Sequence, residues 1–282
     1  MRILAKRDNL DASTKLIYSQ ICEKLGIEQV PLSVALLGNY PKVLSYLWEQ
    51  SSEIFERNET HFVVNGEVRD KLIKFFQEIS LEALTEDFDK QNLEKIYNSL
   101  EKICTQQIVF SLWFVALREA FKGIPNNYFS KTSETYSNSS PSAQENLDDF
   151  FSTKSEIYKA QKPNSLVLNH QINLPSFFEV LRRYSQKFRN QHEYLLIRIP
   201  LEETLLATLQ DKYPKINIDY KHFFILASSY EHLGDLWYLL GDFAPSMHTN
   251  EAIVSQLGLV LLEQLNGKNI LDTGKSQNLI GG

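Results

Sequence analysis

Apolar residues recur at spacings of three and four along most of the chain, and this period is the strongest constraint on its fold. In residues 68–84, for example, Leu72, Phe75 and Ile79 fall on one helix face. Alternation of apolar and polar residues, the mark of a half-buried strand, is nearly absent. The sequence therefore predicts an all-α protein. The predicted helices are 13–25, 42–55, 68–84, 92–122, 144–160, 176–196, 200–212, 219–240 and 249–265.

Capping residues and prolines mark several helix starts. Asp11 or Ser13 precedes the first predicted helix, where a side-chain oxygen can accept a backbone hydrogen bond. Pro31 and Pro41 occupy first-turn positions, and Pro200 is expected to begin a helix of its own.

One helix-start motif is written twice. Residues 30–40 read VPLSVALLGNY and residues 174–184 read LPSFFEVLRRY, with the proline and the tyrosine at the same spacing in both. A repeat of about 140 residues is far too long for a solenoid. It predicts two helical pseudo-repeats packed as an intramolecular pseudo-dimer around a shared centre.

The stretch between the two halves has the composition of a linker. It is rich in Ser and Asn and poor in apolar side chains, so it cannot bury enough surface to form a compact element. We expect four segments: 1–125 as the first helical repeat, 126–143 as the Ser/Asn-rich linker, 144–245 as the second helical repeat, and 246–282 as a C-terminal helix with a loose tail.

The charge balance argues against nucleic acid as a partner. The formal net charge is −6, whereas phosphate contacts need clustered Lys and Arg that carboxylates do not dilute. The local basic residues Arg182, Arg183 and Lys187 are interpreted as a solvated helix face.

Composition also bears on the compartment. The N-terminus has basic residues but no apolar signal-peptide core, and the longest apolar stretch, 108–117, is about half of a membrane span. We expect a cytoplasmic protein with no membrane partner. Cys22 and Cys104 are the only cysteines, too few for a disulfide framework, and each is interpreted as a small core residue.

An ordered set of helix motifs occupies residues 13–55. They are Tyr18, Leu25–Gly26, Pro31, Tyr40–Pro41 and a Leu-x-x-x-Trp helix from Leu44 to Trp48. In this order they resemble the group I α-haloacid dehalogenases, also called the halocarboxylic acid dehydrogenase family. A weaker similarity covers most of residues 13–240. The resemblance implies a fold of two helical pseudo-repeats, similar to the small helical units of the alkylhydroperoxidase D group.

The resemblance also implies a chemistry. Family members hydrolyse 2-halocarboxylic acids with an aspartate that activates water for direct attack on the carbon bearing the halogen, while an asparagine from the first half assists. They use no metal and no organic cofactor. The implied ligand is therefore a small organic acid, and no cofactor is expected.

Carried onto this chain, the family pattern keeps the amide and loses the base. Ser176 matches the serine that precedes the aspartate, and Phe177 falls on the aspartate itself. A phenyl ring cannot accept a proton. The asparagine position falls on Gln107, or on Gln106 if the alignment slips by one, and glutamine has the same hydrogen-bonding groups.

Two other residues could supply the missing base. A slip of two residues would bring in Glu179, but it would turn the position by about 200° on the helix, so Glu179 is more readily a solvated residue. His170 lies just before the same helix, where it could act on water, although an isolated loop histidine is more often on the surface. Ser176 beside it is interpreted as a helix cap.

Further polar and aromatic residues have both a functional and a structural interpretation. Glu231, His232 and Asp235 could poise a proton, but they also read as a polar helix face, and no spacing supports a metal site. Aromatic residues could line a central pocket, although at helical spacing they pack a core by default. The candidate lining residues are Phe177, Ser176, Trp113, Phe110 and Tyr184.

Three functional hypotheses remain from the sequence. The first is a haloacid dehalogenase-like protein that lacks the water-activating aspartate and binds a small organic acid or a hydrophobic ligand, with Gln107, His170 or Glu179 at its site. The alternative is a non-catalytic interaction or scaffold protein. A weaker alternative is an active 2-haloacid hydrolase. A monomer or a homodimer is expected.

Overall fold

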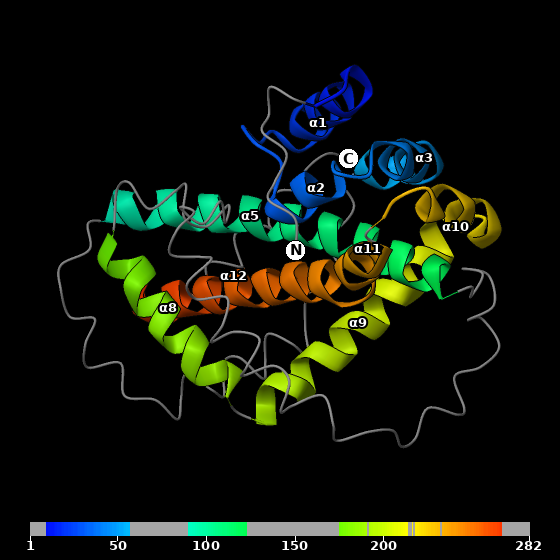
Figure 1. Ribbon diagram of the computed structural model, residues 1–282. Helices are drawn as coiled ribbons and strands as arrows, with labels where there is room; N and C mark the ends of the chain where they lie inside the picture. The colour runs from blue at the N-terminus through cyan, green and yellow to red at the C-terminus, as the bar shows by residue number, and fades with distance from the viewer. Residues whose placement is uncertain are drawn as a thin grey trace, which may run out of the picture. The chain divides into compact units, whose positions relative to one another are not determined.

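The computed structural model of the protein describes residues 10–56, 90–122, 175–190, 192–213, 216, 218–231 and 233–266. The described part of the chain is helical and contains no strand, which confirms the all-α prediction. The predicted helices over 68–84 and 144–160 lie outside the described residues. Figure 1 shows the elements in order. They are α1 (Ala12–Leu25), α2 (Leu32–Leu37), α3 (Pro41–Ser51), η2 (Ser52–Phe55), α5 (Lys90–Phe121), α8 (Pro175–Arg189), α9 (His192–Lys212), α10 (Tyr220–Ser228), α11 (Leu233–Tyr238), η7 (Leu239–Phe243) and α12 (Ala244–Asn266).

The helices divide into two compact units, each built from separate stretches of chain. Unit 1 holds α1, α2, α3, η2, α10, α11 and η7, with α5 from Leu112 and α9 from Leu206. Unit 2 holds α8, the preceding parts of α5 and α9, and α12 from Ser246. The domain boundaries predicted at 125/126 and 143/144 lie outside the described residues.

Helix α1 begins and ends on side-chain and backbone signals that the sequence carries. Asp11 is the N-cap: its carboxylate accepts the backbone N–H of Thr14 at 2.7 Å, and Ser13 donates its hydroxyl to the same carboxylate. The backbone bond from Thr14 lowers the pKa of Asp11. Gly26 ends the helix with φ of 59°, a left-handed conformation that favours glycine.

Aromatic side chains fill the core of unit 1. The indole of Trp113, on α5, lies edge-on to both Trp48 and Phe55. Its Nε1 donates to the hydroxyl of Ser51 at 2.7 Å, and Trp48 donates to Gln20 at 2.9 Å. Both indoles are thus buried with their single donor satisfied, as burial of a polar group requires.

Tyrosines join α3 to the distant α10 region in the same unit. The hydroxyl of Tyr46 accepts the backbone N–H of Asp219 at 2.8 Å. The hydroxyl of Tyr230 accepts the backbone N–H of Lys42 at 3.0 Å, and its ring packs edge-on against Tyr40. These bonds satisfy backbone donors at helix starts, which lack partners within their own helices.

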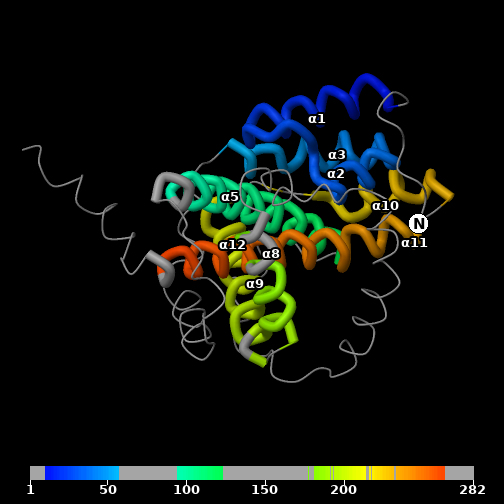
Figure 2. Tube along the Cα trace, turned by 90° about the vertical axis from the view of Figure 1, so that its left-hand side faces the viewer, coloured from blue at the N-terminus to red at the C-terminus, as the bar shows by residue number. Residues whose placement is uncertain are grey.

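Helix α12 is the centre of unit 2. It runs antiparallel to α5, because Gly258 lies beside Leu100 while His248 lies beside Gln107; the two helices lie side by side in Figures 1 and 2. A Cβ on Gly258 would stand 3.0 Å from Leu100 and from Leu181 of α8. Glycine therefore sets how closely the three helices approach.

Two helix boundaries differ from the prediction. Pro200 does not begin a helix: α9 starts at His192 and continues through it. The stripe Ile197, Leu201, Leu205 and Leu209 is buried on both sides of the proline, and burial of this stripe outweighs the local preference for a break. The helix predicted over 176–196 correspondingly ends at Arg189.

The C-terminal helices also depart from the prediction. In place of one helix over 219–240, α10 and α11 are separate, and α11 runs through the π-helical turn η7 into α12. The backbone N–H of Ala244 bonds to the carbonyl of Leu239, five residues back. Pro245 follows and has no N–H to donate to Gly241, which accounts for the wider turn at this point.

The two Pro-led stretches begin helices of different length. Helix α2 has six residues after Pro31, whereas α8 has 15 residues starting at Pro175. The first stretch turns at Gly38 and leads into α3. The arrangement of the halves as a pseudo-dimer remains a prediction.

Within the described ranges, one segment is apolar enough to cross a membrane by length and composition. It is Glu94–Phe121 within α5, and 83% of its most apolar window is buried inside the structure. Burial of this extent is equally typical of a core helix.

The turn after α2 gives a stability prediction. A Cβ on Gly38 would lie 2.0 Å from the hydroxyl of Tyr18, which donates to the carbonyls of Val34 and Ala35 at 3.2 Å each. We expect Gly38→Ala to lower the free energy of unfolding by about 1–3 kcal/mol, because the buried tyrosine must move off both carbonyls. Chemical denaturation measures it.

Gly234→Ala is the matched control, since nothing lies within 4 Å of its added Cβ on α11, and it should be neutral or stabilising. In a Tyr18→Phe background, the cost of Gly38→Ala should fall. An undiminished cost would contradict the clash.

Candidate functional site

Gln107 is the predicted site residue that the structure places most informatively. It lies in the part of α5 that belongs to unit 2, and only 3% of it is exposed. Its backbone carbonyl accepts the hydroxyl of Ser111 at 2.7 Å, one turn further along the helix. A glutamine so deeply buried needs a partner for its amide.

The partner is His248 of α12. His248 Nδ1 lies 2.7 Å from Gln107 Oε1, and the imidazole stacks on the ring of Phe110 with centroids 4.9 Å apart and an interplanar angle of 24°. An amide oxygen can only accept, so Nδ1 carries the proton. Phe110, predicted to line a pocket, thus forms one face of this pair.

Burial fixes the protonation state of His248. The side chain is fully buried, and desolvation lowers its pKa to about 3. The imidazole is therefore neutral at physiological pH. A base this weak is poorly matched to proton abstraction from water, because an effective general base has a pKa near the working pH.

The amide nitrogen of Gln107 takes no part in the contact with His248, which uses the amide oxygen. Among the residues that the structure describes, its oxygen is paired with His248, while its Nε2 has no hydrogen-bond partner. The two N–H groups are thus available to an acceptor. A hydrogen bond from this nitrogen to a bound acceptor would contribute about 0.5–1.5 kcal/mol net.

A second polar pair lies further along the contact between α5 and α12. Gln256 Nε2 donates to the sulfur of Cys104 at 2.9 Å, and burial raises the pKa of this thiol to about 12. Cys104 is therefore an inert, protonated core residue, as expected. Cys22 is only partly buried.

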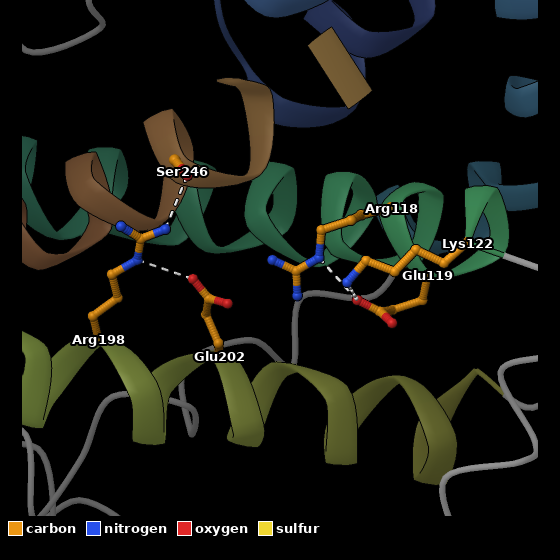
Figure 3. A network of polar contacts seen from close by, with 6 residues as sticks. All are labelled: Arg118, Glu119, Lys122, Arg198, Glu202 and Ser246. Atoms are coloured by element: carbon orange, nitrogen blue, oxygen red, sulfur yellow. Dashed lines mark hydrogen bonds and ion pairs between the residues drawn. The ribbon is translucent and has the colours of Figure 1, made fainter. Parts of the chain in front are cut away.

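Polar contacts to α9 hold the start of α12 on its other side. Arg198 donates to Glu202 at 3.0 Å and to Ser246 at 2.9 Å, as Figure 3 shows, and Tyr194 donates to Asn250. These contacts fix the rotation of α12 and with it the direction of His248.

Figure 3 also draws a polar cluster that belongs to unit 1. The buried carboxylate of Glu119 accepts from Arg118 at 2.8 Å and from Lys122 at 3.3 Å. Both cations come from the same stretch of α5 as Glu119, so the cluster neutralises one buried charge locally.

The other predicted site residues are placed as follows. Phe177 and Tyr184 are buried in unit 2, and Trp113 is buried in the core of unit 1. Ser176 and Glu179 lie in α8, but their side chains are not among those described, and His170 lies outside the described residues. Of the sequence-predicted set, the structure thus brings together Gln107 and Phe110.

His248 was not predicted from the sequence. It stands one residue before the helix expected over 249–265, in a polar stretch. Its spacing carried a signal, since His248, Ala252, Ser255 and Leu259 follow one another at four, three and four residues and all are buried. Extending the apolar phase backwards would have placed the imidazole on the buried face.

No group of three or more His, Cys, Asp or Glu side chains suited to a metal ion occurs within the described ranges. Glu231 is exposed, and His232 lies outside those ranges.

Protonation of His248 should couple stability to pH. The pKa of His248 is about 3 in the folded state and about 6.5 in the unfolded state. Between these two pH values the unfolded state binds more protons than the folded state, so stability falls as the pH drops from about 6.5 toward 3. We expect His248→Gln to flatten the decline between pH 6.5 and 5 by about 1–2 kcal/mol. Urea denaturation across this range measures the effect.

The matched control is His222→Gln, which removes an exposed imidazole. An equal acid sensitivity of the His248→Gln and His222→Gln variants would contradict burial of a neutral His248.

The chain matches no protein-family model, no curated protein and no solved structure. The likeness to the α-haloacid dehalogenases therefore rests on the sequence motifs alone.

Proposed function

We propose that this protein binds a small organic molecule at the Gln107–His248 pair and does not hydrolyse it. The observation that carries the proposal is the unpartnered amide nitrogen of a glutamine that is 3% exposed. Such a donor can bind the oxygen of a carbonyl group or of a carboxylate, including the carboxylate of a halogen-bearing acid. The ring of Phe110 supplies an apolar surface beside it.

The hydrogen bond from His248 supports a binding role for Gln107. It occupies the amide oxygen and so holds the side chain in one orientation, with its N–H groups directed away from the imidazole. A donor that is already oriented loses little entropy when a ligand binds. A glutamine in this state resembles a receptor group more than a proton-transfer group.

Three features argue against hydrolysis. The family's aspartate position falls on Phe177, which is buried and has no ionisable group. His248 has a pKa of about 3, because burial disfavours its charged form. Cys104, on the same helix as Gln107, could act as a nucleophile only as a thiolate. Burial disfavours that charged form and keeps the thiol protonated.

The absence of hydrolysis is directly testable. With both enantiomers of 2-chloropropionate, we expect the protein to release no chloride above the protein-free rate, measured by a chloride assay over a range of pH. Excess chloride that disappears in Gln107→Met would overturn this half of the proposal and support an active hydrolase.

Binding is tested with the same acids and with propionate. We expect a ligand at ten times its dissociation constant to raise the free energy of unfolding by about 1.4 kcal/mol. Gln107→Met should abolish this rise, because methionine has a side chain of similar length but no N–H to offer. Denaturation with and without ligand measures both.

Gln256→Met is the matched control: it makes the same change on α12, where the glutamine donates to Cys104. The rise should persist in this variant. If none of these acids raises the free energy of unfolding of the wild-type protein, the proposed binding site is refuted. The alternative of a non-catalytic interaction protein is then favoured.

A further inference from the structure

Helix α8 presents a row of cations on its outer side. Arg182, Arg183 and Lys187 are all exposed, and so is Gln186 between them. We call Arg182, Arg183 and Lys187 the α8 basic face. The opposite side of the helix is buried through Leu181, Tyr184 and Phe188, so the orientation of the helix is set by packing, and its cations are held toward solvent.

The cations of this face differ from the other described arginines. Arg118 pairs with Glu119, and Arg198 pairs with Glu202. No residue of the α8 basic face makes an ion pair with a carboxylate among the described residues.

Arg189 at the end of the helix differs from this face: its buried Nε has no hydrogen-bond partner in the described part of the chain, but its charge acts on the carboxyl of Glu251, whose pKa it lowers against the effect of burial. In a chain of net charge −6, a helix face with three exposed cations that pair with no described carboxylate is a local exception.

Two of the cations are restrained by an aromatic ring. The guanidinium of Arg183 and the ammonium of Lys187 lie 5.9 and 6.0 Å from the centroid of Tyr184. Cation–π contacts of this kind limit the rotamers of long side chains. A partner that pairs with restrained cations loses less side-chain entropy than one that must order them.

We propose that the α8 basic face binds an acidic, carboxylate-rich segment of a partner protein. Charge complementarity identifies the partner: three exposed cations within six residues match a short run of Asp and Glu. Arginine suits it well, because its planar fork pairs with a carboxylate through two hydrogen bonds. The proposal is independent of the Gln107–His248 pair.

Two other polyanions fit less well. Binding to an anionic bilayer is strengthened by apolar side chains that enter the interface, and the apolar residues described in α8 are buried. A long nucleic acid would extend beyond the α8 basic face over a protein of net charge −6, which repels it. A short acidic segment avoids both difficulties.

The test uses the full chain and a fluorescent peptide of alternating Asp and Glu, followed by anisotropy. We expect binding that weakens as salt rises, since these contacts are exposed. Arg182→Glu/Arg183→Glu/Lys187→Glu should reduce affinity at least about tenfold. The milder Arg182→Gln/Arg183→Gln/Lys187→Gln variant repeats the test if the first is unstable in thermal unfolding.

The charge-matched control is Lys15→Glu/Lys42→Glu/Lys221→Glu, which alters three exposed lysines of unit 1 and should leave the affinity unchanged. The proposal is overturned by no peptide binding, or by equal weakening in this control. Tighter binding to single-stranded oligothymidylate or to phosphatidylserine vesicles than to the peptide would also overturn it, in favour of another class of partner.

Discussion

Burial of α12 is the constraint on which unit 2 depends. From Leu257 to Glu263 every residue of this helix is buried, so the protein covers this stretch on all of its sides. A helix in this position cannot solvate polar groups, and each must find a partner within the protein. Gly258 lets the side chains of Leu100 and Leu181 approach the backbone of α12. Nearer the start of the helix, His248 finds its partner in Gln107. Tight apolar packing and one oriented hydrogen bond thus arise from the same burial.

In unit 1, buried aromatic side chains carry polar groups that also need partners. Its core contains two indoles, and each reaches a short polar side chain, Ser51 or Gln20, with its single donor. The ring of Trp113 contacts the rings of Trp48, Phe55 and Phe114, and its role in lining a pocket stays a prediction. Large rings in edge-on contact gain from both buried area and ring electrostatics.

The helical periodicity was sufficient to predict the class of fold, because buried apolar residues recur three and four positions apart along the described helices. The boundaries at Pro200 and in α11 to α12 failed for a physical reason: local signals compete with burial, and only the tertiary structure reveals which dominates. Gln107 was identified through the family resemblance. Its partner was not, because residues 107 and 248 are far apart in the chain and no periodic pattern links a glutamine on one helix to a histidine on another.

The pKa shifts in unit 2 point to one electrostatic design. Burial lowers the pKa of His248 and raises those of Cys104 and Glu251, so each shift favours the neutral form of its group. The cations of the α8 basic face lie instead on the outer side of α8, where solvent stabilises them. At the proposed site a ligand would be recognised by hydrogen bonds and shape, since a buried anion would find no cation beside the Gln107–His248 pair among the described contacts. A carboxylate ligand would then have to draw its stabilisation from the amide N–H groups of Gln107, and a neutral carbonyl compound would enter at a lower desolvation cost.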